Sequence, residues 1–109
     1  MTSIDTPRPI EMFLDATARG DSDAFVAAFT QDAYLEDWGR SFHGHDGVRD
    51  WDRTDNTGVQ SHIELVTLTA GSGTDSYVGT VQVSGNGFNG TGTMTFTLRD
   101  DHISSLVVS

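Results

Sequence analysis

A long alternation of side chains near the end of the sequence is the feature that most restricts the fold. Apolar residues or glycines occupy every second position from Phe88 to Leu98, and asparagine or threonine fills each position between them. Successive residues of a strand point to opposite faces, so this pattern predicts a β-strand with one buried face. The buried face would consist of Phe88, Gly90, Gly92, Met94, Phe96 and Leu98.

Three further segments in the second half have strand patterns. They are His62 to Ala70, Tyr77 to Ser84 and Ile103 to Val108. The apolar face changes near Leu65-Val66, which predicts a β-bulge. Gly85-Asn86-Gly87 is a strong hairpin signal. We therefore expect four long strands, joined by short turns.

Helical patterns dominate the first half. Thr6 is expected to cap a helix with Pro7 at its first position, and Gly20 to end it. Its apolar stripe would be Ile10, Phe13, Leu14 and Thr17. Ser22 is expected to cap a second helix, whose buried side would be Phe25, Val26 and Phe29. A short strand is expected from Ala33 to Asp37. The chain would turn at Trp38-Gly39 and return as a second short strand from Arg40 to His43. A third helix would run from Asp46 through Arg53.

This order of elements predicts an α+β fold (α-α-β-β-α-β-β-β-β). Four long strands, one of them bulged, should form a curved mixed or antiparallel sheet. Three helices laid across it would give a cone with an internal pocket. We expect a single domain over residues 1–109, with a loose tail over residues 1–6.

Composition excludes several kinds of site. The 109 residues contain no cysteine, and all six basic residues are arginine. Disulfides, zinc ribbons and lysine Schiff bases are therefore ruled out. The formal net charge of −10 disfavours nucleic acid as a partner. The longest apolar run, Ala24 to Phe29, is too short to span a membrane. No apolar leader is visible in Met1 to Pro9, so we expect a cytoplasmic protein.

Several segments of the first half carry a family resemblance. They are Ala18-Arg19-Gly20-Asp21, Phe25 to Phe29, Asp32 to Asp37, Phe42-His43-Gly44 and Gly47 to Trp51. They resemble the nuclear transport factor 2-like superfamily, which includes ketosteroid isomerases, SnoaL-like polyketide cyclases and limonene epoxide hydrolases. Gly39 to Gly44, followed by Arg49-Asp50-Trp51, is most similar to the SnoaL-like branch. The resemblance implies the cone fold, a small apolar ligand and a homodimer, and we expect no cofactor.

Asp37 is the candidate catalytic base. Leu35-Glu36-Asp37-Trp38 resembles the Val-Glu-Asp-Pro segment of the isomerases, whose aspartate is the general base. Asp37 also shares a strand face with Leu35, which is expected to face the core. A carboxylate at the mouth of an apolar pocket loses hydration, which makes it more basic. The alternative is that Asp37 only stabilises the turn before Gly39.

The resemblance also implies where the isomerases place two oxyanion donors, a tyrosine and a protonated acid. Phe13 and Met94 fall at these positions, and neither side chain is a useful hydrogen-bond donor. One such donor is worth roughly 2.7–4 kcal/mol to the transition state. The sequence therefore argues against a steroid isomerase, and any chemistry would need another electrophile.

Other residues are candidates for ligand binding or proton transfer. Aromatic and apolar side chains expected to line the pocket are Phe13, Phe29, Trp38, Trp51 and Met94, although most could equally form the core. Gly90 and Gly92 would leave space for an aromatic ring or a cavity. His62 is a general acid or base candidate if its strand face lines the pocket. We expect no metal site, because His43, His45 and Asp46 have no further ligand at motif spacing.

Two functions remain open on the sequence alone. The first is a cofactor-free, SnoaL-like enzyme of isomerase, cyclase or lyase type, acting on an apolar carbonyl or polyketide-like substrate. The second is a non-catalytic binding or dimerisation module for a small apolar ligand. The charged run from Arg49 to Asp55 is interpreted as a solvated helix face, with only Asp55 able to reach the pocket mouth. The epoxide hydrolases use an Asp-Arg-Asp arrangement, but take it from neighbouring strands.

Overall fold

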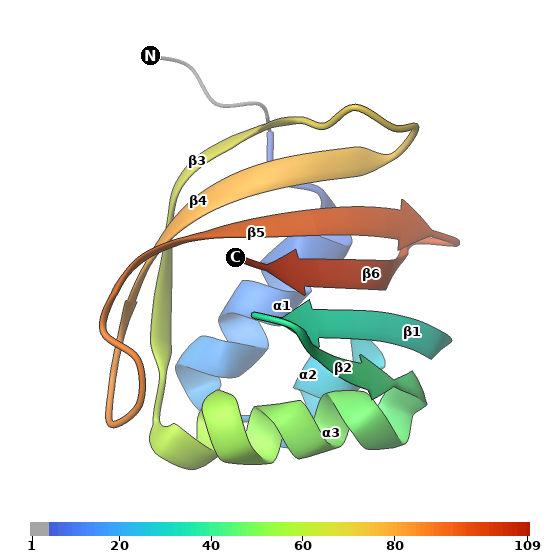
Figure 1. The fold of residues 1–109 in the computed structure, drawn as a ribbon. Helices are drawn as coiled ribbons and strands as arrows, with labels where there is room; N and C mark the ends of the chain where they lie inside the picture. Colours follow the sequence, from blue (N-terminus) through green and yellow to red (C-terminus); the bar gives the residue numbers. More distant parts are fainter. Residues whose placement is uncertain (1–4) are drawn as a thin grey trace.

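The computed structural model describes residues 5–109 and shows an α+β fold (Figure 1). Its helices are α1 (Arg8–Arg19), α2 (Ser22–Ala27), α3 (Gly44–Asp55) and the short 3₁₀ helix η1 (Thr57–Val59). Its strands are β1 (Phe29–Asp37), β2 (Arg40–His43), β3 (His62–Ala70), β4 (Ser76–Ser84), β5 (Gly90–Arg99) and β6 (His102–Val108). The predicted class and order of elements are confirmed. The predicted tail falls mostly outside the described residues.

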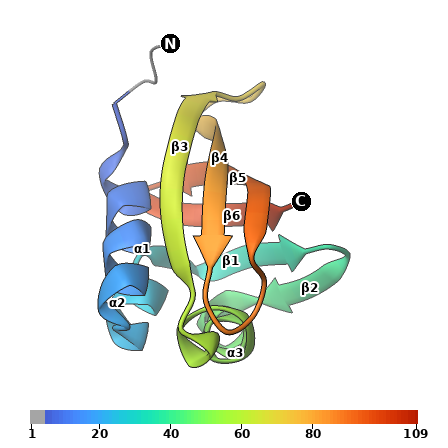
Figure 2. The same cartoon turned by 90° about the vertical axis from the view of Figure 1, so that its left-hand side faces the viewer.

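The strands form one six-stranded mixed sheet in the order β2-β1-β6-β5-β4-β3. Neighbours are antiparallel except β1 and β6, which are parallel. The β3–β4 register shifts between Leu65 and Thr67, which confirms the predicted bulge. The sheet arches over α1 and α2, while α3 lies along its lower end (Figures 1 and 2). The end of β1, the first half of β5 and the end of β6 contribute residues to the pocket described below.

Several element ends differ from the predictions. Helix α1 begins at Arg8, with Pro7 at the cap position and no side-chain cap, so the Thr6 cap is wrong. Asp21, not Ser22, caps α2 by accepting a hydrogen bond from the backbone N–H of Ala24 at 3.0 Å. Aspartate and serine are both good capping residues, and the pattern could not decide between them. Among the described residues, no helix has the length and hydropathy needed to cross a membrane.

The core is a cluster of phenylalanine rings between the helices and the sheet. Phe13 of α1 packs against Phe25, Phe29 and Phe96, with ring centres 5.1, 6.2 and 5.5 Å away. All four side chains are buried. Aromatic pairs at these spacings add stabilisation beyond the area that they bury. The cluster fixes α1 and α2 against the middle of the sheet and leaves the α3 end to form the pocket.

Candidate functional site

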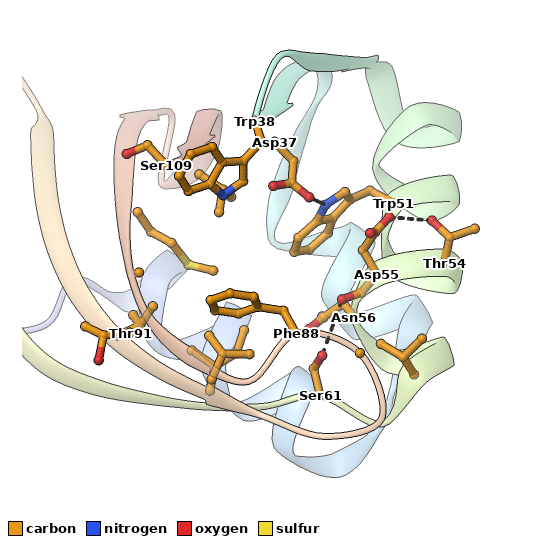
Figure 3. Close-up of a pocket in the computed structure, with 18 residues that line it drawn as sticks. Asp37, Trp38, Trp51, Thr54, Asp55, Asn56, Ser61, Phe88, Thr91 and Ser109 are labelled. Carbon is orange, nitrogen blue, oxygen red and sulfur yellow. Dashed lines mark hydrogen bonds between the residues drawn. The ribbon is translucent and has the colours of Figure 1, made fainter.

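A pocket lies where the ends of the strands meet α3 (Figure 3). Water-sized molecules can occupy about 120 Å³ of it. One wall is apolar and is formed by Ile63, Val81, Val83, Met94 and Val108. Polar side chains of the lining include Asp37, Thr54 and Asp55. Small-molecule sites combine such an apolar lining with a few convergent polar groups.

Asp37 is positioned at the pocket by the register of β1. Leu35 and Asp37 pair with Leu106 and Val108 of the parallel neighbour β6, so both side chains point to the inner face. The Asp37 side chain is only 13% exposed. Its Oδ2 accepts hydrogen bonds from Trp51 Nε1 at 2.9 Å and from an Arg40 guanidinium nitrogen at 2.7 Å. The second oxygen points away from Trp51, towards the side of the pocket where Trp38 lies (Figure 3).

Arg40 joins Asp37 to a second carboxylate, that of Asp55. Two guanidinium nitrogens donate to the Asp55 oxygens at 2.9 and 3.2 Å. The guanidinium also lies 5.5 Å from the centre of the Phe42 ring. The hydrogen bond with Asp55 is the main reason that the pKa of Arg40 is raised. Asp37, Arg40 and Asp55 thus form a carboxylate–guanidinium–carboxylate cluster at the mouth of the pocket.

The electrostatic balance at Asp55 keeps this side chain ionised. Burial alone raises the pKa of Asp55, but hydrogen bonds from Arg40 and Thr54 outweigh burial, so the pKa is lowered. The Thr54 hydroxyl donates to Asp55 at 2.6 Å. Asp55 therefore carries its charge at neutral pH and cannot supply a proton there.

The end of α3 is fixed by a buried polar network. Asp52 is only 1% exposed, which corrects the prediction that the whole run from Arg49 to Asp55 faces solvent. Its Oδ1 accepts hydrogen bonds from Asn56 Nδ2 at 3.1 Å and the Thr57 hydroxyl at 2.7 Å. Asn56 also donates to the Thr17 hydroxyl of α1 at 3.0 Å. The network ties the α3–η1 junction to α1 and so holds Asp55 at the pocket.

The structure brings some of the predicted site residues together and separates others. Asp37, Trp38, Trp51 and Met94 line the pocket. Phe13 and Phe29 do not line it, because both belong to the buried ring cluster. His62 begins β3 with an exposed side chain and lines a shallow depression beside Gly20 instead. His62 is therefore not brought to Asp37.

Arg40 and Phe88 contribute to the site in ways that the sequence did not predict. Arg40 pairs with Asp37 across the Trp38-Gly39 turn. A two-residue turn of this kind puts the flanking residues side by side, so the spacing could have indicated the pair. Phe88 was expected on the buried face of β5, but β5 begins at Gly90 and Phe88 lines the pocket from the preceding loop.

Replacing Arg40 should make the protein more sensitive to acid. In Arg40→Gln, burial of Asp55 is no longer outweighed by the guanidinium, so the pKa of Asp55 should rise. A carboxyl with a lowered pKa stabilises the fold above its ordinary pKa of 3.8 and loses this effect as the pH falls through the folded value. Acid unfolding of Arg40→Gln, followed by circular dichroism, should therefore begin at a higher pH.

Arg53→Gln is the matched control for this experiment. Within the part of the chain that the structure describes, the Arg53 guanidinium makes an exposed contact with Asp50, at 3.5 Å, and does not touch the pocket carboxylates. Such exposed pairs contribute little to stability. If both variants shifted the acid transition equally, the shift could not be attributed to the loss of the Arg40 contact with Asp55.

Comparison with known proteins identifies the family. A family model of SnoaL-like domains matches residues 10–106. A protein from Sinorhizobium meliloti assigned to the polyketide cyclases is 28% identical over all of both chains, with a TM-score of 0.87. No curated protein sequence matches the chain significantly.

More distant structures share the fold alone. The epoxide hydrolase/cyclase-like enzyme SalBIII, which acts in pyran ring formation in salinomycin, is 22% identical over 92% of this chain and 85% of its own, with a TM-score of 0.81. The RV0760c protein of Mycobacterium tuberculosis, solved with estradiol-17beta-hemisuccinate, is 12% identical over 92% of this chain and 88% of its own, with a TM-score of 0.80. With the family match and the cone-shaped sheet, these comparisons show that the chain belongs to the SnoaL-like family of the nuclear transport factor 2-like superfamily.

Proposed function

We propose that the protein is a cofactor-free enzyme that uses Asp37 to remove a proton from a carbon next to a carbonyl group. The substrate would be a small, apolar, polyketide-like compound held in the pocket. The observation that carries the proposal is the hydrogen bonding of the two Asp37 carboxylate oxygens. One of its oxygens is fixed by Arg40 and Trp51, while no group of the described residues donates a hydrogen bond to the other oxygen, which faces a largely apolar pocket.

The proposed step needs the substrate, this carboxylate and a hydrogen-bond donor to the carbonyl oxygen, which neither Phe13 nor Met94 can provide. The free oxygen of Asp37 takes the proton, and the electrons of the broken C–H bond form the double bond of an enolate. The carbonyl oxygen receives the negative charge. Return of the proton to a different carbon would isomerise the substrate, whereas attack of the enolate on another carbonyl of the same molecule would close a ring. Arg40 and Trp51 hold the base in place, which is a positioning role.

The relatives support this class of chemistry. The Sinorhizobium meliloti protein is assigned to the polyketide cyclases, and SalBIII acts in ring formation. RV0760c was solved with a steroid derivative bound, which supports a flat apolar ligand.

We also expect a homodimer that pairs through the outer, threonine-rich face of β5. His62 has no part in the proposed step, because its side chain lies outside the pocket.

Epoxide opening is a second reaction to consider, because the carboxylate–guanidinium–carboxylate cluster resembles the Asp-Arg-Asp arrangement of the epoxide hydrolases. In that reaction one carboxylate would activate water and a protonated carboxyl would donate to the epoxide oxygen. The lowered pKa of Asp55 leaves it without the proton for this role at neutral pH. The cluster therefore favours proton abstraction by Asp37 over acid-assisted epoxide opening.

Hydrogen exchange of a simple ketone tests the proposal. β-Tetralone is a bicyclic apolar ketone with exchangeable protons next to its carbonyl. In heavy water, native protein should accelerate loss of these proton signals in the NMR spectrum over the rate in buffer, and Asp37→Asn should not. Exchange no faster than in buffer, together with saturable binding of the ketone, would support the non-catalytic binding module instead.

A further inference from the structure

Two large aromatic side chains remain exposed at the mouth of the same pocket. Trp38 is 76% exposed and Phe88 is 59% exposed, and both line the pocket. Among the described residues, Val66, at the bulge of β3, is the other large apolar side chain with comparable exposure. Figure 3 shows the Trp38 ring above and the Phe88 ring below the space beside Asp37. Exposed apolar groups that gather at a concave site indicate ligand contact.

The backbone of Trp38 makes its exposure more informative. Its φ is 50°, in the left-handed region, and it is followed by Gly39 with φ 88°. Hairpin turns of this kind ordinarily take asparagine or aspartate before the glycine, because a bulky side chain is unfavourable there. The Trp38 ring gains little burial in return. A strained residue that folding does not require is a reason to look for a role at a binding site.

Phe88 is held at the mouth by its own loop. The Asn89 side chain donates to the Gly85 and Gly87 carbonyls at 2.9 and 3.2 Å, which closes the loop around Phe88. The ring lies over Gly90, where an added Cβ would come 3.1 Å from its Cζ. The glycine at position 90 thus leaves room for the ring beside the pocket.

Trp38 also offers a free hydrogen-bond donor. Its indole nitrogen is turned towards the pocket in Figure 3, on the side of the free Asp37 oxygen. The other tryptophan at the site, Trp51, already donates its N–H to Asp37. Among the described residues, no group accepts a hydrogen bond from the Trp38 indole. A ligand oxygen in this position could accept from Trp38 while lying next to the catalytic carboxylate.

We propose that Trp38 and Phe88 bind a flat, conjugated ring between them and that the Trp38 N–H binds an enol, phenol or carbonyl oxygen of that ring. This inference rests on the proposed function for the role of Asp37, but it concerns ligand choice. It selects aromatic or conjugated carbonyl compounds over saturated terpenoids, because flat rings stack on aromatic faces.

Binding of β-naphthol, measured by NMR titration, tests this inference. β-Naphthol is flat and carries one hydroxyl, naphthalene lacks the hydroxyl, and β-decalol keeps the hydroxyl but is saturated and not flat. Native protein should bind β-naphthol at least tenfold more tightly than β-decalol. Trp38→Phe keeps a ring but loses the donor, so it should weaken β-naphthol binding about fivefold without affecting naphthalene. Phe88→Leu should weaken binding of both aromatic compounds.

Trp38→Asn provides a readout that a merely structural role for Trp38 would not give. Asparagine suits the left-handed turn position, so this variant should melt at a higher temperature while binding β-naphthol more weakly. The inference is overturned if native protein fails to bind β-naphthol, if it binds β-decalol equally well, or if both single variants bind as the native protein does. Ketone exchange that depends on Asp37 could still be present in each of these cases. Conversely, Trp38-dependent binding without exchange would reject the proposed enzyme and leave this inference standing.

Discussion

Asp37→Asn is expected to slow the exchange of β-tetralone protons by a hundredfold or more. An amide oxygen is far too weak a base to take a proton from carbon, and a positioned general base contributes about 10²–10⁴-fold to such reactions. The substitution preserves the shape of the side chain. Its amide oxygen can still accept the hydrogen bond that Trp51 now donates at 2.9 Å. The fold should therefore survive, and the loss should appear in the rate constant of exchange rather than in ketone binding.

Asp75→Asn is a matched control for this prediction. Asp75 is exposed, lies outside the pocket and carries the same charge as Asp37. Its φ of 56° is readily adopted by asparagine, so the exchange rate and the melting temperature should both stay close to native values. Asp37→Asn with a native melting curve and an undiminished exchange rate would remove Asp37 from the mechanism. β-Naphthol binding to Asp37→Asn should persist, since both aromatic rings and the Trp38 donor remain.

Features that depend on local periodicity were predictable from the sequence. The alternation in β5 and the bulge in β3 follow from which side chains must face the core, and a slip of one residue would expose the whole apolar set. The inward direction of Asp37 follows from the same rule through its neighbour Leu35, which is fully buried. Sequence alone could therefore place one functional side chain on the inner face, although it could not supply that side chain's partners.

Features that depend on how separate elements meet were not predictable. The contact of Arg40 with Asp55 joins β2 to the last turn of α3, and it depends on α3 extending to Asp55 rather than ending at Arg53. Asp52 shares the charged pattern of its neighbours but faces Asn56, so its burial depends on the α3–η1 junction. The same types of apolar and aromatic side chain also fill the core and line the pocket. Apolar periodicity identifies an inward face without showing which part of that face is filled and which part is open.

This difference between core and pocket predicts that Phe13→Ala lowers stability strongly and leaves the site intact. Phe13 is fully buried among three other phenylalanine rings. Truncation of a buried phenylalanine to alanine costs about 3–5 kcal/mol, because contacts are lost and a cavity remains. A small domain has a free energy of unfolding of only about 5–15 kcal/mol, so the melting temperature should fall by more than about 10 °C. If the alanine variant is too unstable to purify, Phe13→Leu can replace it. The melting temperature of Phe13→Leu should lie below that of the native protein, by less than the fall expected for Phe13→Ala.

Phe88→Ala removes the same side chain from the exposed mouth and should show the reverse pattern. Because Phe88 is 59% exposed, its loss should change the free energy of unfolding by less than about 1 kcal/mol. The same change should weaken β-naphthol binding, whereas Phe13→Leu should bind β-naphthol as the native protein does. Thermal melts and NMR titrations of these variants therefore separate the two roles. The contrary result would be a loss of β-naphthol binding in Phe13→Leu at a native melting temperature. In that case Phe13 and the rings around it would belong to the ligand site, and their assignment to the core would be wrong.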